Sequence, residues 1–242
     1  HVNIVRNGIF RICDTKSDQF PKQTVVHGLG LCFTKSHWSS HPGWAKGWFK
    51  QSIEKPNYKG KYFYRYCTKS SHFKHVLNEA LKNEIHIETS SAFDIDIVNN
   101  LKQAGKIKPS TYVICNGFKR DQYVKNIGGL INSGHQNCIP IIDNYEELEL
   151  LQKETDKKFK VGIRIASEEE PKFEFYTSRL GIGYKNIVSF YEREIAKNEQ
   201  VDLKMLHFFI NTGIKDNAYY WNELMKCLNV YINLKKTCTT LD

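Results

Sequence analysis

From about residue 60 onward, the apolar and polar positions of the chain follow two alternating patterns. Short runs rich in β-branched and aromatic residues predict strands, and each is followed by a longer run with helical periodicity. The predicted strands are Tyr62–Cys67, Ile85–Glu88, Tyr112–Cys115, Cys138–Ile142, Lys160–Ile165 and Leu203–Phe209. The predicted helices are His72–Lys82, Ala92–Gln103, Lys119–Asn132, Tyr145–Thr155, Asn186–Ala196 and Tyr219 to about Lys235.

The boundaries of these elements carry their own signals. Ser90 or Ser91 can cap the second of these helices, and Asp143 or Asn144 can cap the fourth. Successive strands begin mostly about 22 to 27 residues apart, which is typical of βα units in a barrel or a doubly wound sheet. Because each helix must carry the chain back across the sheet, the strands are expected to pair in parallel.

The first part of the chain has a weaker pattern. VRNGIFRI, residues 5–12, is compatible with a hairpin edge, and TVVHGLGLCFTK, residues 24–35, with two short strands. WAKGWFKQSIEK, residues 44–55, has its aromatic residues at helical spacing and predicts an amphipathic helix. We expect residues 1–45 to form a separate N-terminal segment and residues 46–242 to form the barrel portion.

Six strands are too few for a closed (β/α)8 barrel. The chain ends in KKTCTTLD, where a further strand would be expected. We therefore expect an α/β fold with a parallel sheet, either a doubly wound sheet or a partial (β/α)8 barrel of the TIM type with about six of its eight strands.

Composition narrows the class of protein. The chain has 242 residues, of which 40% are apolar and 25% charged, as in ordinary globular proteins. Its net charge is +9, but basic residues alternate with acidic ones, so no nucleic-acid footprint is expected. No stretch is long and apolar enough for a membrane span, and HVNIVRNGIF lacks the apolar core of a signal peptide, so we expect a cytoplasmic protein without a membrane partner. The seven cysteines are scattered without CxxC spacing, which favours free thiols.

Metal and nucleotide motifs are weak. His37 and His41 are four residues apart, but the following Pro42 indicates a loop and no third ligand lies near, so no metal is expected. GIG, residues 181–183, lacks the rest of a dinucleotide fingerprint, although its backbone N–H groups could bind a phosphate.

One lysine stands where the first regular strand passes into a helix. In YFYRYCTKSSHFKH, residues 62–75, Lys69 follows the strand and is framed by hydroxyl residues. A solvated lysine is one interpretation. The other is a Schiff-base lysine, which needs an amine in a dry pocket so that its neutral form attacks a carbonyl.

The neighbouring strand ends favour the second interpretation. Glu88, Asn116, Arg164 and the segment HFFINTG, residues 207–213, are expected at the carboxyl ends of four other strands, the edge that forms active sites in barrels. Arg164 keeps its charge and needs an anion, and Glu88 is the candidate partner.

Seven motifs in this order resemble a known family. They are YRYCTKSSHFKHVL, IETSSAFDI, VICNGFKRDQ, IIDNYEELELL, VGIRIASEEEPKF, SRLGIG and LHFFINTGI. Together they are similar to the pyridoxal-phosphate-dependent basic amino acid decarboxylases with the alanine-racemase-type barrel, and most of all to biosynthetic arginine decarboxylases. The resemblance implies pyridoxal 5'-phosphate as cofactor, a lyase that converts arginine to agmatine in polyamine biosynthesis, and a homodimer or higher oligomer for the full-length form.

The resemblance also implies roles for individual residues. Lys69 matches the lysine that carries the cofactor, Glu88 the acidic position of the second strand, and Arg164 the arginine that closes the fifth. Phosphate contacts would come from the segment Asn211, Thr212 and Gly213.

Two departures from the family pattern bear on activity. Phe209 stands where the family has a histidine, so it can stack on the cofactor ring but cannot donate a proton. His207 is expected one layer deeper on the same face of the strand. The main phosphate loop, the carboxylate for the pyridine nitrogen and the C-terminal β-domain of the family are not in these 242 residues, so we expect an inactive fragment with weak cofactor binding and little or no turnover.

Other functions stay open at this point. Diaminopimelate and ornithine decarboxylases are the alternatives within the family. Outside catalysis, the alternatives are a pyridoxal-phosphate-binding carrier or regulatory barrel, or an interaction module without the cofactor.

Overall fold

Parallel strands and the helices between them form the main body of the protein. The computed structural model describes residues 5–7, 26–27, 30–31, 63, 65–83, 85–166, 180–209 and 217–241. The strands of the main sheet are β1 (Val5–Asn7), β4 (Arg65–Cys67), β5 (His86–Thr89), β6 (Val113–Cys115), β7 (Cys138–Ile142), β8 (Phe159–Ala166), β9 (Ile182–Gly183) and β10 (Val201–Phe209). The helices are α3 (Lys74–Leu81), α4 (Ala92–Gln103), α5 (Asp121–Asn132), α6 (Glu146–Glu154), α7 (Ile187–Phe190) and α8 (Asn217–Lys235).

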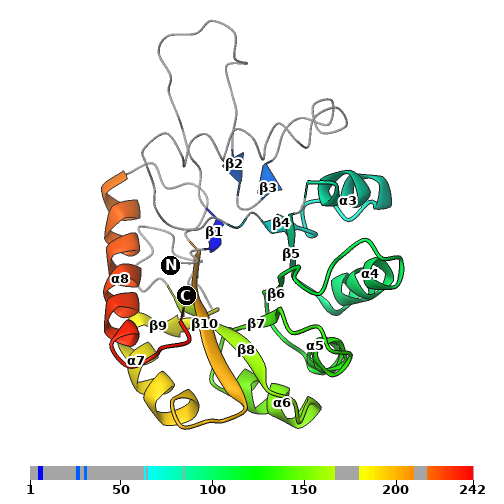
Figure 1. Ribbon diagram of the computed structural model, residues 1–242. Helices are drawn as coiled ribbons and strands as arrows, with labels where there is room; N and C mark the ends of the chain where they lie inside the picture. The colour runs from blue at the N-terminus through cyan, green and yellow to red at the C-terminus, as the bar shows by residue number, and fades with distance from the viewer. Residues whose placement is uncertain are drawn as a thin grey trace, which may run out of the picture.

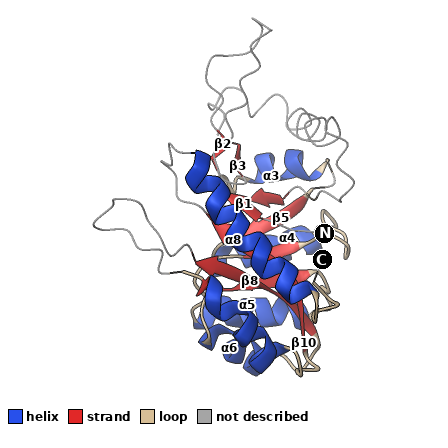
Figure 2. Cartoon of the chain, turned by 90° about the vertical axis from the view of Figure 1, so that its left-hand side faces the viewer, coloured by secondary structure: helices blue, strands red, loops and turns tan. Residues whose placement is uncertain are grey.

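The strand order is that of a βα barrel wall. It runs β1-β10-β8-β7-β6-β5-β4, with β9 beside β8, and every pairing in it is parallel. The sheet curves, and helices α3 to α8 lie along its outer side (Figure 1). Seen from the side, α8 crosses the outside of the strands (Figure 2). All six predicted strands of the barrel portion are therefore confirmed, with ends that differ by a few residues.

The chain adds a strand that the pattern did not indicate. Val5 of β1 pairs with His207 of β10, and Asn7 pairs with Phe209, in parallel. The prediction of a hairpin edge is thus wrong for residues 5–7, because the free edge of β10 offers its backbone groups to a distant part of the chain. The two short strands are confirmed as β2 (Val26–His27) and β3 (Gly30–Leu31), which pair antiparallel. The predicted helix at 44–55 lies outside the described residues.

The helix expected from Asn186 to Ala196 is irregular. It consists of the 3-10 turn η1 (Tyr184–Asn186), then α7, then the π-helical η2 (Tyr191–Ile195). Two of the predicted capping residues, at the N-termini of α4 and α6, are confirmed by hydrogen bonds. Ser91 Oγ accepts from Asp94 N–H at 3.3 Å, and Asn144 Oδ1 accepts from Glu147 N–H at 3.1 Å.

Strand alternation divides the core into an outer and an inner part. The large outer cluster, which includes Ile87, Val113 and Ile163, packs the sheet against the helices. A smaller inner cluster consists of Ile114, Ile139, Ile141 and Met205. The inner side chains therefore fill the barrel below the carboxyl ends of the strands, as in other βα barrels.

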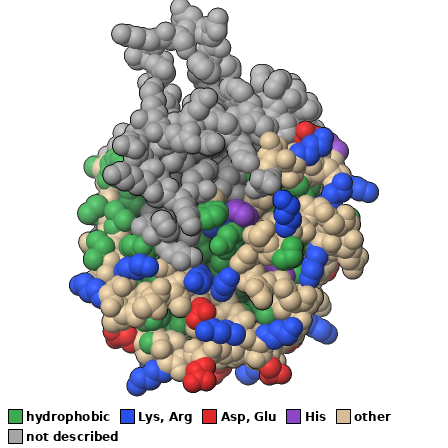
Figure 3. Space-filling view, in the orientation of Figure 1, with side chains coloured by type: hydrophobic (Ala, Val, Ile, Leu, Met, Phe, Trp, Pro, Cys, Tyr) green, Lys and Arg blue, Asp and Glu red, His purple; other side chains and the backbone are tan. Residues whose placement is uncertain are grey.

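No helix of the described part combines the length and the apolar character that a bilayer crossing would require. On the face shown in Figure 3, basic side chains are spread over the described surface and acidic ones lie among them.

Candidate functional site

A polar layer lies above the apolar filling of the barrel. Its members come from the inward positions at the carboxyl ends of successive strands. They are Glu88 on β5, Asn116 after β6, Asp143 after β7, Arg164 on β8 and His207 on β10, and all are at least nine-tenths buried. The sequence analysis predicted Glu88, Asn116 and Arg164 at these strand ends, and the structure brings them into one layer.

Lys69 stands at the rim of this layer. It lies in a turn after β4 that is closed by the hydrogen bond from Ser70 N–H to the Cys67 carbonyl, 3.1 Å. The adjacent Thr68 ties the turn to β5, because its N–H and its hydroxyl both donate to the Glu88 carbonyl, at 3.0 and 3.1 Å. The Lys69 side chain is exposed to solvent. The expectation that a dry pocket surrounds its amine is therefore wrong for this structure. The reason is geometric: the turn places Lys69 beyond the last paired residue, Cys67, which is level with Glu88.

Glu88 is a carboxyl group under strong environmental influence. Burial raises its pKa to about 6, while the hydrogen bond from Asn116 and the charges of Arg65 and Arg164 act in the opposite direction. Its Oε1 accepts from Asn116 Nδ2 at 3.1 Å. Its Oε2 is buried without a hydrogen-bond partner among the described residues, which leaves an acceptor atom at the mouth of the barrel.

Arg164 is paired differently from the prediction. Its Nη1 lies 3.7 Å from Asp143 Oδ1, whereas Glu88 acts on it only through longer-range attraction. The physical reason is the strand order, since β7 is the direct neighbour of β8 and β5 is two strands further away. Burial lowers the pKa of Arg164, yet a guanidinium keeps its charge at neutral pH.

Asp143 lies between two cations. Lys119 Nζ is 3.9 Å from its Oδ2, and Arg164 faces its other oxygen. Burial raises the pKa of Asp143, and these two cations counteract the rise. Lys119 in turn lies 3.1 Å from Glu147 Oε2 and donates to the carbonyls of Gly117 and Ile141.

Four residues of this network were missed as site residues. They are Arg65, Lys119, Asp143 and Glu147. Asp143 had been interpreted only as a helix cap. The signal that would have identified it is strand parity: Ile139 and Ile141 face inward, so the next inward position is Asp143.

Other predicted residues are placed in part or not at all. His207 is buried, and its Nε2 lies 3.3 Å from Asn116 Nδ2, so it contacts the polar layer and does not stand apart from it. The backbone of Phe209 ends β10, but the description does not extend to its side chain. Asn211, Thr212 and Gly213 lie outside the described residues.

The segment GIG has a structural use. Gly181 has φ +104°, and its N–H donates to the Asp143 carbonyl at 2.9 Å, so this N–H group is not available to a phosphate. An added Cβ would lie 2.8 Å from Ala166 N, and this close approach of two backbones requires glycine.

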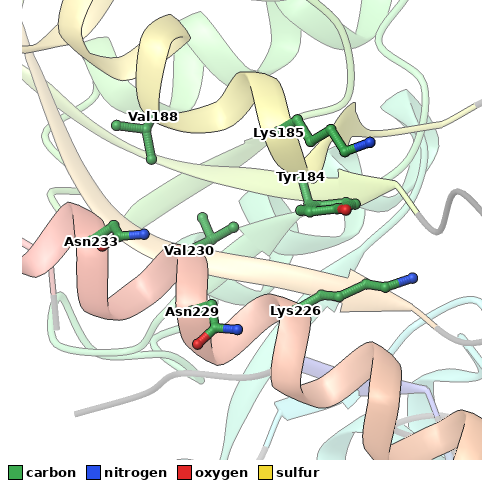
Figure 4. A pocket seen from close by; sticks show the side chains of 7 residues that line it. All are labelled: Tyr184, Lys185, Val188, Lys226, Asn229, Val230 and Asn233. Carbon is green, nitrogen blue, oxygen red and sulfur yellow. The ribbon is translucent and has the colours of Figure 1, made fainter.

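A cavity of about 370 Å³ lies elsewhere, between η1, α7 and α8 (Figure 4). Its lining consists of Tyr184, Lys185, Val188, Lys226, Asn229, Val230 and Asn233. Lys185 and Lys226 each lie 5.6 Å from the centre of the Tyr184 ring. None of the polar-layer residues lines this cavity, so it is separate from the barrel mouth.

The residues at the mouth fit a small anionic aldehyde cofactor. Lys69 offers an accessible primary amine, Arg164 a buried cation, and Glu88 Oε2 an unused acceptor. A buried carboxylate oxygen without a hydrogen-bond partner is costly unless a ligand or water supplies a donor. The described residues therefore form part of a ligand site with groups for covalent attachment and for charge pairing.

Comparisons with known proteins agree with this arrangement. Residues 49–242 match the family model "Pyridoxal-dependent decarboxylase, pyridoxal binding domain". A biosynthetic arginine decarboxylase of Vibrio cholerae serotype O1 is 25% identical over 211 residues, which are 80% of this chain and 32% of that protein. The chain thus spans about a third of the length of this curated relative.

Solved structures show the same fold at lower identity. The biosynthetic arginine decarboxylase of Campylobacter jejuni superposes with a TM-score of 0.61 and 20% identity, covering 85% of this chain and 34% of that one. Diaminopimelate decarboxylase from Helicobacter pylori, complexed with L-lysine, gives a TM-score of 0.63 and 17% identity, covering 81% of this chain and 49% of that one. These likenesses support the barrel fold that the strand order shows.

Proposed function

The chain belongs to the pyridoxal-dependent decarboxylase family, whose pyridoxal-binding domain it contains, and from that premise we propose that it serves decarboxylation of a basic amino acid, with arginine as the substrate. The observation that carries the proposal is the polar layer, in which Glu88 and Arg164 lie buried at strand ends, with Glu88 tied through Thr68 to the turn that holds Lys69. The curated relatives named biosynthetic arginine decarboxylase support arginine, and hence agmatine as product.

The roles of the residues follow from their positions. Lys69 is the amine that would bind the cofactor aldehyde covalently, because it is the lysine at the rim of the mouth and is open to a ligand. Arg164 supplies positive charge near the anionic groups of the ligand, and Glu88 Oε2 accepts a hydrogen bond from it. When bound, pyridoxal phosphate supplies a ring that withdraws the electrons left behind as carbon dioxide departs. Phe209 would provide a stacking surface, and Asn211, Thr212 and Gly213 would contact the phosphate.

The protein's wider setting is part of the proposal. We place the reaction in polyamine biosynthesis in the cytoplasm, carried out by a homodimer or a larger oligomer. We also propose that residues 1–45 are distinct from the cofactor-binding barrel portion, 46–242. The matched stretch is about a third of the relatives' length, so we expect appreciable turnover to need more of that architecture than these 242 residues.

A second candidate is a barrel that binds pyridoxal phosphate without catalysis. The exposure of Lys69 favours it, because a decarboxylase needs its reacting centre shielded from water. Phenylalanine at position 209 also favours this second candidate, because its side chain has no proton to donate.

Carbon dioxide release with added pyridoxal phosphate tests the proposal. Arginine, ornithine, lysine and diaminopimelate are compared, both with this chain and with a chain extended to the relatives' length. Release from arginine that exceeds the others by at least about tenfold, a difference of about 1.4 kcal/mol in barrier, supports the arginine assignment. Preference for another substrate overturns it, and cofactor binding with no release in either chain favours the second candidate.

A further inference from the structure

One amide side chain connects two titratable groups across the barrel. Asn116 Nδ2 lies 3.1 Å from Glu88 Oε1 and 3.3 Å from His207 Nε2. Glu88 belongs to β5 and His207 to β10, strands that are separated in the sheet by β6, β7 and β8. The contact therefore runs through the barrel interior and not along the sheet.

The orientation of this amide is determined by a third contact. Asn116 Oδ1 accepts from the N–H of Gly117 at 2.9 Å. Because a backbone N–H can only donate, the oxygen must be on that side of the amide. The nitrogen, with its two hydrogens, therefore faces Glu88 and His207.

The two hydrogens account for both contacts. One is donated to the Glu88 carboxylate, and the other is donated to His207 Nε2. Nε2 must then be the acceptor nitrogen of the ring, so the ring proton is on Nδ1. A doubly protonated ring would set its Nε2–H against the amide hydrogens.

The charges around His207 also disfavour a second proton. Burial lowers the pKa of His207 well below its ordinary value, and Arg164, Lys119 and Arg65 lower it further. Glu88 is the carboxyl group connected to the ring through Asn116, and Asp143 is held between Lys119 and Arg164. The surrounding charges of the polar layer therefore favour the neutral form of the His207 ring.

Two atoms are left at the ends of this chain of contacts. Glu88 Oε2 and His207 Nδ1 are buried without a hydrogen-bond partner among the described residues. We propose that Asn116 is a positioning residue that holds His207 in the neutral Nδ1–H tautomer and directs the free oxygen of Glu88 toward the bound ligand. The inference deepens the proposed function and rests on it for the identity of that ligand, pyridoxal phosphate.

The tautomer can be measured on the protein without any cofactor. Long-range proton–nitrogen correlation spectra of uniformly nitrogen-15-labelled chain distinguish Nδ1–H from Nε2–H rings, and His207→Gln assigns the signal. We expect wild-type His207 to be neutral at pH 7 with its proton on Nδ1. An Nε2–H ring or an imidazolium in the wild type overturns the inference, whether or not any Asn116 variant folds.

Variants then test whether Asn116 is the cause. In Asn116→Asp a carboxylate replaces the donor, so the proton is expected to move to Nε2, and in Asn116→Ala the Nδ1–H preference is expected to weaken. Thr89→Val is the matched control, because Thr89 is buried on the same strand as Glu88 but bonds to Ile114 and Tyr123. An unchanged tautomer in Asn116→Asp overturns the inference.

Cofactor affinity gives the functional readout. We expect Asn116→Ala to weaken binding of pyridoxal phosphate about tenfold, as loss of one hydrogen bond to a charged group would, and Thr89→Val to leave it unchanged. Equal affinities for Asn116→Ala and wild type would overturn the link to the ligand. If wild type binds no pyridoxal phosphate, the proposed function fails, while the tautomer result is judged by itself.

Discussion

Lys119 and Glu147 form a fully buried ion pair at the carboxyl end of the barrel. Nζ of Lys119 lies 3.1 Å from Oε2 of Glu147, and both side chains are almost completely shielded from solvent. Glu147 also accepts from the backbone N–H groups of Lys119 and Asp143, at 3.0 and 2.8 Å. The pair therefore ties the loop after β6 to the first turn of α6, and the bond from Asp143 extends this link to the loop after β7.

Replacing Lys119 by methionine is expected to destabilise the protein by about 3–5 kcal/mol, because Glu147 would stay buried without its cation. The double variant Lys119→Met with Glu147→Met should recover part of this loss. The free energy of unfolding in urea measures both. Lys153→Met is the control, since Lys153 and Glu149 form an exposed pair at 4.0 Å that is worth less than about 1 kcal/mol. Equal effects at Lys119 and Lys153 would contradict the buried pair.

The raised pKa of Glu88 predicts a pH-dependent stability. Folding raises this pKa from 4.5 to about 6, so the folded state holds the proton more tightly than the unfolded state. The resulting stabilisation is present below pH 4.5 and is lost as the pH rises through about 6. Glu88→Gln cannot lose a proton, so from pH 4.5 to 7.5 its stability should rise relative to wild type by up to about 2 kcal/mol.

Urea unfolding at a series of pH values checks this prediction. Glu149→Gln, on the exposed face of α6, should follow the wild-type profile. If the free energies of unfolding of Glu88→Gln and wild type differ by a constant amount over this range, Glu88 has the same pKa in the folded and the unfolded protein. That result would contradict the prediction.

Gly162 explains how β8 fits between its neighbours inside the barrel. A Cβ there would lie 2.5 Å from Ile141 Cδ1 and 2.7 Å from Met205 Cγ. Gly162→Ala should therefore cost about 1–3 kcal/mol of stability through overpacking. Gly129 on α5 has no atom within 4 Å of an added Cβ, and Gly129→Ala should be neutral or stabilise by up to about 1 kcal/mol. Thermal unfolding measures the stability of both variants. A loss of stability in both variants, or in neither, would contradict this packing.

Much of the fold was predictable because each strand and helix shows its own period. The strands β4 to β8 and β10, the cap at Ser91 and the end of α8 near Lys235 followed from local patterns, whereas the two-residue strand β9 did not. The strand β1 did not, because Val5–Asn7 pairs with a strand some two hundred residues later and only that partner defines it.

The candidate site was predictable by strand end but not by pairing. Glu88 and Arg164 were identified as inward residues, yet the partner of Arg164 is Asp143 at 3.7 Å. Which carboxylate meets a given arginine depends on strand adjacency and side-chain reach. Exposure of Lys69 likewise depends on a turn whose geometry the sequence leaves open, since hydroxyl residues suit both a buried and an exposed amine.

The central claim is that Lys69 carries the cofactor. The most direct measurement is to incubate the chain with pyridoxal phosphate, reduce with borohydride, and locate the added group by peptide mass mapping. We predict a single dominant label on Lys69 that is absent from Lys69→Arg, while Lys74→Arg, at an exposed position of α3, keeps it. A label that is spread over surface lysines, or that is concentrated on Lys185 or Lys226 beside the outer cavity, would contradict the account.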